Sequence, residues 1–154
     1  MDMALEQART AASEGEVPVG AVLALPGGTT YAARNRSESG SPLGHAEMEA
    51  LGQALSAEGR RGLGAATLYV TAEPCIMCLG AMVHARIGGL VYACEEPRFG
   101  GVATLGVLWK EGRYPHRFPI ASGLREGEAR KLLQDFFATR RRSGESENRG
   151  AGEE

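Results

Sequence analysis

The chain has 154 residues, of which 43% are hydrophobic and 23% charged, and its formal net charge is −2. A chain of this length and composition folds as one domain with a sizeable core, which excludes an intrinsically disordered protein. The 22 glycines lack the strict repeat of collagen, and the nearly balanced charge gives no overall sign of nucleic-acid binding.

Apolar periodicity and turn residues predict helices alternating with strands along the chain. Helices are expected at 3–14, 45–55, 74–86, 102–109 and 126–142, and strands at 17–25, 29–35, 66–71, 90–94 and 116–121. Because strands and helices alternate, we expect an α/β layered domain with a sheet covered on both faces. Residues 1–142 form this domain, whereas the polar composition of 143–154 predicts a disordered tail.

Three cysteines are too few, and odd in number, for a disulfide framework. The first residues are acidic where a secretory signal needs basic ones. The longest uncharged run, 17–33, is interrupted by prolines and glycines and predicts a hairpin rather than a membrane span. We therefore expect a cytoplasmic protein with reduced thiols and no membrane partner.

Charge is unevenly distributed along the chain. Residues 1–59 carry three basic and eight acidic side chains, whereas residues 97–142 carry ten basic and four acidic ones. Such a bipolar molecule can hold a polyanion on its basic face. Chance clustering on a solvated surface is the alternative interpretation.

A Cys-x-x-Cys pair, Cys75 and Cys78, stands at the start of a predicted helix, directly after Pro74. In a reduced compartment such a pair is either half of a zinc site or a redox dithiol. The N-terminus of a helix stabilises thiolates, and the spacing lets both sulfurs bind one ion. A closed structural site needs a second such pair, which the sequence lacks, so His45 is the expected third ligand and the fourth position stays open.

Glu47 follows His45 by two residues at the start of another predicted helix. From there its carboxylate can reach a water molecule in the open position without binding the metal itself. This pairing is typical of general acid–base chemistry at a catalytic zinc ion. The combined pattern His-x-Glu…Pro-Cys-x-x-Cys therefore predicts a catalytic zinc site.

This pattern is the signature of zinc-dependent nucleobase deaminases. Three longer stretches resemble bacterial tRNA-specific adenosine deaminases, a family of the cytidine deaminase superfamily, and the resemblance covers nearly all of residues 3–142. The stretches are GEVPVGAV (15–22), ATLYVTAEPCIMCLGAMVHARI (66–87) and LLQDFFATRRR (132–142).

The resemblance implies a three-layer α/β/α fold of the cytidine-deaminase type with a five-stranded mixed sheet. It implies one Zn²⁺ held by His45, Cys75 and Cys78, with Glu47 as the proton carrier. Water would attack C6 of adenine and ammonia would leave, so that adenosine at the wobble position of a tRNA anticodon becomes inosine. The family works as a homodimer.

The resemblance also suggests substrate contacts, each with a structural alternative. Asn35 matches a position that hydrogen-bonds the target base, although an asparagine there also suits a turn. Phe136 and Phe137 would stack on bases or pack in the core. Arg140 and Arg141 would meet phosphates of the anticodon stem-loop, or only complement the end of their helix.

Two segments depart from the family pattern. Residues 95–101 read EEPRFGG where an Asp-x-Lys-x-Gly-Ala-like stretch is usual, and Leu43-Gly44 replaces a Thr-Ala pair. A deaminase of a free nucleobase or nucleoside, of the guanine or cytosine type, is therefore the first alternative. A non-catalytic, zinc-stabilised RNA-binding module is the second, and the presence of Glu47 argues against it. The sequence assigns no role to four further residues: Glu73, His84, Cys94 and Trp109.

Overall fold

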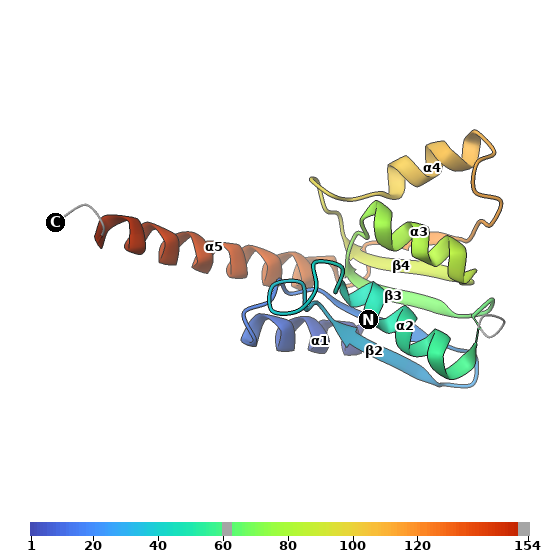
Figure 1. Cartoon of the computed structure of the whole chain (residues 1–154), viewed down its shortest axis with the longest axis horizontal. Coiled ribbons are helices and arrows are strands. Elements are labelled where there is room, and N and C mark those ends of the chain that lie inside the picture. The colour runs from blue at the N-terminus through green and yellow to red at the C-terminus, as the bar shows by residue number, and fades with distance from the viewer. Residues whose placement is uncertain (60–62, 151–154) are drawn as a thin grey trace.

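The computed structural model describes residues 1–59 and 63–150, of which 143–150 are described by their backbone alone. Helices and strands alternate along most of the chain (Figure 1). In chain order the elements are α1 (Asp2–Ser13), β1 (Gly20–Ala24), β2 (Thr30–Arg34), α2 (Ala46–Glu58), β3 (Thr67–Ala72), α3 (Ile76–Ala85), β4 (Gly89–Cys94), α4 (Val102–Lys110), β5 (Ile120–Ser122) and α5 (Glu126–Gly150).

The five strands form one mixed sheet in the order β2-β1-β3-β4-β5. Strand β1 pairs antiparallel with β2 and β3, whereas β3, β4 and β5 run parallel. Helices α1 and α5 cover one face, and α2, α3 and α4 cover the other (Figure 1). This confirms the expected three-layer α/β/α fold with a five-stranded mixed sheet.

The two faces of the sheet are packed differently. Under α2, α3 and α4 lies the larger core, with Leu68, Val70 and Leu90 from the sheet. The other core is smaller and contains Leu5 of α1 and Ala129 of α5. Ala4 and Ala8 of α1 and Gly20 of β1 are small, which lets α1 approach the sheet closely.

The carboxyl ends of β3 and β4 meet at one edge of the sheet, where Ala72 pairs with Cys94. The backbone N–H of Glu73 donates a 2.8 Å hydrogen bond to the carbonyl of Cys94, so the two chains leave the sheet together. Ligand sites in α/β folds lie at this edge of parallel strands. The segments that carry the cysteine pair and the 95–101 loop both begin here.

Two element boundaries differ by four residues or more from the expected ones. Strand β5 begins at Ile120 rather than at 116, because Pro115 and Pro119 have no N–H to donate to a sheet. Helix α5 extends to Gly150, beyond the expected end at Arg142, and projects from the body (Figure 1). Residues 151–154 of the expected tail lie outside the described residues, and its disorder stays a prediction. None of the described helices has the length and apolar character needed to cross a bilayer.

Candidate active site

The N-termini of α2 and α3 supply the three expected metal ligands. His45 immediately precedes α2 and has an extended backbone, with φ −72° and ψ 146°. Cys75 immediately precedes α3 and is also extended, with φ −73° and ψ 168°. Cys78 lies one turn into α3 and is buried. Unpaired N–H groups at a helix start favour negative charge, which suits thiolate ligands.

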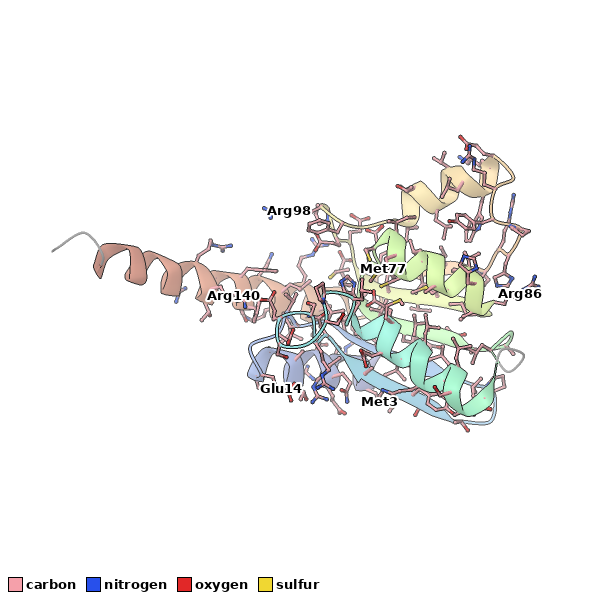
Figure 2. All side chains as sticks on the ribbon, in the orientation of Figure 1. Met3, Glu14, Met77, Arg86, Arg98 and Arg140 are labelled. Carbon is pink, nitrogen blue, oxygen red and sulfur yellow. The ribbon has the colours of Figure 1, made fainter. Side chains whose placement is uncertain are left out.

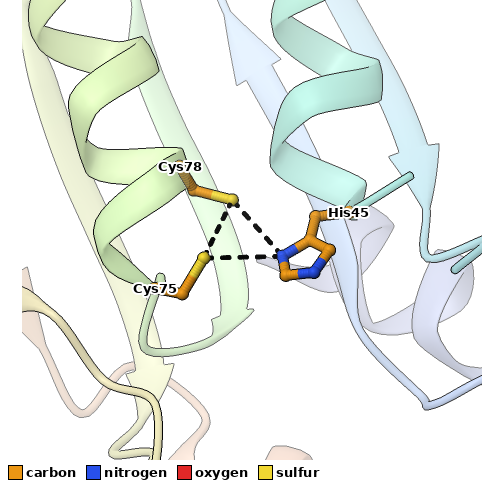
Figure 3. A group of neighbouring side chains, drawn as sticks. All are labelled: His45, Cys75 and Cys78. Atoms are coloured by element: carbon orange, nitrogen blue, oxygen red, sulfur yellow. Dashed lines mark hydrogen bonds between the residues drawn. The ribbon is translucent and has the colours of Figure 1, made fainter. Parts of the chain in front are cut away.

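The three side chains converge on one point (Figure 3). The His45 Nδ1 atom lies 3.6 Å from the sulfur of Cys75 and 3.5 Å from that of Cys78, and the sulfurs are 3.7 Å apart. Ligands of a tetrahedral zinc ion, with Zn–S near 2.3 Å and Zn–N near 2.05 Å, are separated by about 3.6 Å for N···S and about 3.8 Å for S···S. The donor set and its spacing therefore fit Zn²⁺.

The two thiols do not ionise alike. A hydrogen bond from the Cys78 thiol, supported by His45, lowers the pKa of Cys75 to about 4 despite partial burial. The pKa of Cys78 is raised, because its proton is donated to Cys75 and its sulfur is largely buried. A divalent cation that binds both sulfurs must displace the remaining thiol proton.

Glu47 lies in the first turn of α2 and is only 4% exposed, yet it lines the same cleft as His45 and Cys75. Burial raises the pKa of its carboxyl, against the opposing effects of its own backbone N–H and of His45. A carboxyl with a raised pKa can both accept and release a proton near neutral pH. It lies beside the ligand triangle without being part of it.

The cleft has a volume of about 970 Å³. Its floor contains His45, Glu47 and Cys75, and its walls come from the loop before α2, from 95–99 and from α5. Leu133, Gln134 and Phe137 are among the α5 residues that face it. This size is at the upper end of small-molecule pockets, so it admits more than a single base.

The predicted substrate contacts are not all at the cleft. Phe137, 40% exposed, lines it, whereas Phe136 packs edge-to-face on Phe137 and carries the Arg140 guanidinium 5.0 Å from its ring centre. Arg140 is ion-paired with Glu38 at 3.1 Å. Arg141 is exposed. The structure thus brings Phe137 to the metal ligands and gives Phe136 and Arg140 protein partners.

Asn35 is 5% exposed, and its amide donates to Glu16 and to Ser37. Ser37, rather than Asn35, is among the residues that line the cleft. The expected contact between Asn35 and a base stays a prediction.

Two acidic residues without an assigned role prove to be structural anchors. Glu73 accepts hydrogen bonds from the backbone N–H groups of Glu96 and Val102 and so holds the 95–101 loop. Glu16 is 1% exposed and holds the loop before α2. An acid between apolar segments indicates a carboxylate that needs hydrogen-bond donors if it is buried, but it does not indicate which residues supply them. Of the other unassigned residues, Cys94 is buried and the indole N–H of Trp109 donates to the carbonyl of His116. His84 is exposed, with its ring centre 6.5 Å from that of Tyr114.

Residues 1–141 match the family model of MafB19-like deaminases. The chain belongs to this deaminase family. The deaminase is 40% identical to the tRNA-specific adenosine deaminase of Bacillus subtilis over 138 aligned residues. The alignment covers 89% of this chain and 86% of that protein. The family resemblance seen in the sequence is confirmed, and the deaminase is a hydrolytic enzyme rather than a non-catalytic module.

Solved structures show the same relationship. One, from a study of A-to-I editing by tRNA:A34 deaminases at the wobble position of transfer RNA, aligns with the deaminase at a TM-score of 0.78 and 38% identity. The alignment covers 86% of this chain and 97% of that one. Guanine deaminase from Nitrosomonas europaea aligns at 0.71 with 24% identity over 89% of this chain and 82% of its own, which shows a common fold.

Proposed function

We propose that the deaminase converts adenosine to inosine at the wobble position of a tRNA anticodon and that it uses one Zn²⁺ per chain. The observation that carries this proposal is the triangle of His45, Cys75 and Cys78 beside the buried Glu47. That site stands in a chain 40% identical to a tRNA-specific adenosine deaminase.

Zn²⁺ at this triangle would supply Lewis acidity that activates a water molecule at neutral pH. His45 contributes a neutral nitrogen, and the two sulfurs contribute the negative charge that balances the ion. Three protein ligands leave a fourth position for water, as in catalytic zinc sites generally.

Glu47 performs the proton transfers. Deamination adds water across the C6–N1 bond of adenine and expels the amino group as ammonia, so one proton must reach ring N1 and another the leaving nitrogen. Glu47 takes the first proton from the water and delivers it to N1 as the oxygen bonds to C6. It then takes the second proton from the new C6 hydroxyl and delivers it to the amino group, so that the C6–N bond breaks and the C6 carbonyl forms. Burial of the carboxyl raises its pKa and suits it to both directions of transfer.

The walls of the cleft suit a single-stranded loop of RNA. A base splayed out of an anticodon loop reaches a deep pocket at little cost in stacking energy. Phe137 offers a ring at the cleft, and Arg98 and Arg130 line the same opening with positive charge. Figure 2 shows Arg98 at the tip of the loop after β4 and Arg140 along α5.

A deaminase of free guanine, or of another base or nucleoside, is the second candidate. The fold shared with guanine deaminase and the unusual 95–101 segment at the cleft favour it. The basic residues on α5 and in the 95–101 loop favour the RNA substrate.

One assay separates the two candidates. The purified chain is incubated with an anticodon stem-loop that carries adenosine at the wobble position, and separately with guanine, cytosine and their nucleosides. We expect inosine in the RNA and no turnover of the small molecules. Turnover of a free base with unchanged RNA would refute the proposal. Glu47→Gln is the control, because it should keep the metal and lose the activity.

We also propose a homodimer that acts in the cytoplasm. Exposed Ile76 and Val107 provide apolar surface on α3 and α4 for a second copy. The three free cysteines suit a reducing compartment. Sedimentation of the zinc-loaded chain at micromolar concentration tests the dimer, and a species with the mass of one chain would contradict it.

A further inference from the structure

A chain of hydrogen bonds runs from the interior to the cleft through residues 35–39. It begins at Glu16, which accepts from the backbone N–H groups of Glu38 at 2.9 Å and Ser39 at 2.8 Å, and from the Ser39 hydroxyl at 2.6 Å. The amide nitrogen of Asn35 is a fourth donor at 3.2 Å. Backbone N–H groups can only donate, so Glu16 is an acceptor on every side.

The direction of the next bonds follows from this. Because Glu16 only accepts, the nitrogen of the Asn35 amide, and not its oxygen, must face it. The same nitrogen donates to the Ser37 hydroxyl oxygen at 2.8 Å. Both hydrogen atoms of the amide are then used, and the amide orientation is fixed.

Ser37 is the outer end of this series of hydrogen bonds, since it lines the cleft with His45 and Glu47. Its oxygen accepts from Asn35, which leaves the hydroxyl proton to be donated. No acceptor for that proton is found among the residues that the structure describes.

We propose that Ser37 contacts the substrate by donating a hydrogen bond into the cleft, and that Asn35 and Glu16 are positioning residues that aim its proton. This inference rests on the proposed function and adds a contact to it. The partner is an oxygen or nitrogen acceptor of the target nucleotide, either on the base or on the ribose and phosphate.

The loop of residues 35–39 is also held by a side chain of helix α5. Arg140 of α5 donates to the Glu38 carboxylate at 3.1 Å and to the carbonyl of Gly15 at 3.5 Å. Arg140 thereby spans the residues before β1 and the loop before α2. A loop fixed from both sides presents the Ser37 hydroxyl at little cost in conformational entropy when a ligand binds.

The first test is Ser37→Ala, assayed on the anticodon stem-loop with adenosine at the wobble position. One neutral hydrogen bond corresponds to an increase in KM of about three- to tenfold, with kcat within about twofold. Zinc content and thermal midpoint should not change. Ser41→Ala is the matched control, because its hydroxyl accepts from the N–H of Leu43 and lies outside the cleft. An unchanged KM in Ser37→Ala would overturn the proposal.

The second test addresses the direction in which these hydrogen bonds are donated, from Asn35 to Ser37. In Asn35→Ala the Ser37 oxygen loses its donor and its proton is no longer aimed into the cleft, so KM should rise about as much as in Ser37→Ala. Adding Ser37→Ala to this variant should raise KM no further, because the two changes remove the same bond. If the fold-increase in KM of the double variant equals the product of those of the two single variants, the role of Asn35 in aiming Ser37 is refuted.

Modified substrates locate the acceptor. Stem-loops with 2′-deoxyadenosine or 7-deazaadenosine at the target position remove one acceptor each. The substrate on which Ser37→Ala no longer raises KM has lost the partner of Ser37. An increase that persists on both assigns the bond to another ring nitrogen or to a phosphate oxygen.

Failure of the proposed function is recognised separately, as an absence of inosine with the unaltered chain. The comparison of Ser37→Ala with the unaltered chain is then made on the free base or nucleoside that is deaminated. A rise in KM there supports the contact, and an equal KM refutes it.

Discussion

The carboxylate of Glu73 accepts a 3.1 Å hydrogen bond from the backbone N–H of Val102, which joins the end of β3 to the first residue of α4. Its second oxygen accepts a 3.2 Å bond from the N–H of Glu96. Gly100 passes so close that a Cβ atom there would lie 2.3 Å from the same carboxylate. One side chain therefore sets the path of the loop that walls the cleft.

Glu73→Ala should loosen this loop. Two backbone N–H groups lose their acceptor, and the free energy of unfolding should fall by about 1–3 kcal/mol. Trypsin should then cleave faster after the exposed Arg98, as measured by mass spectrometry beside urea unfolding. Glu95→Ala, a change of an exposed acid in the same loop, should leave both measurements unchanged. Equal cleavage rates in Glu73→Ala and the unaltered chain would contradict the assigned role.

The close contact between α1 and the sheet gives a second prediction. A Cβ atom on Gly20 would lie 2.0 Å from the carbonyl oxygen of Ala4, which is backbone and cannot move aside. Gly20→Ala should lower the free energy of unfolding by about 1–3 kcal/mol through the displacement of α1. Gly52→Ala is the matched control, since nothing lies within 4 Å of its Cβ in helix α2. That change should stabilise the chain by about 0.5–1 kcal/mol. Urea unfolding measures both.

The ligand triangle was predictable because its signals are local. A proline before a Cys-x-x-Cys pair and an apolar run predict a helix start, and α3 begins at Ile76, directly after Cys75. The same holds for His45 before α2. Once both residues are placed at helix starts, the topology of the sheet brings these starts together.

The anchors were not predictable in this way. Glu16 finds its donors at Glu38 and Ser39, more than twenty residues later, and no local pattern announces that pairing. Phe136 and Phe137 share one apolar stripe in the sequence. Only the packing of α5 against the body places Phe137 at the cleft and leaves Phe136 against Arg140.

Removal of the metal should destabilise the domain. Cys75→Ala deletes one ligand, so zinc content should fall from about one per chain to near zero, and the thermal midpoint should fall with it, because metal binding contributes directly to folding. Cys94→Ala, which changes a buried thiol outside the ligand triangle, should keep the zinc. A chelator should lower the midpoint of the unaltered chain and of Cys94→Ala, but not that of Cys75→Ala. Full zinc content in Cys75→Ala, measured by atomic emission, would refute the ligand set.

Acid should weaken the anchor at Glu16. Burial favours its neutral form, but hydrogen bonds from the Ser39 hydroxyl and from the N–H groups of Glu38 and Ser39 outweigh burial and lower the pKa. A folded-state pKa below the unfolded value of about 4.3 stabilises the fold above that pH, and the contribution is lost as the pH falls through the folded pKa. Glu16→Gln removes the charge at every pH. The difference in thermal midpoint between the unaltered chain and Glu16→Gln should therefore be largest at pH 7 and shrink below pH 4. Glu14→Gln, at an exposed ion pair with Arg34, should show a smaller difference at pH 7. A difference for Glu16→Gln that is constant from pH 7 to pH 3 would show that its charge does not hold the loop.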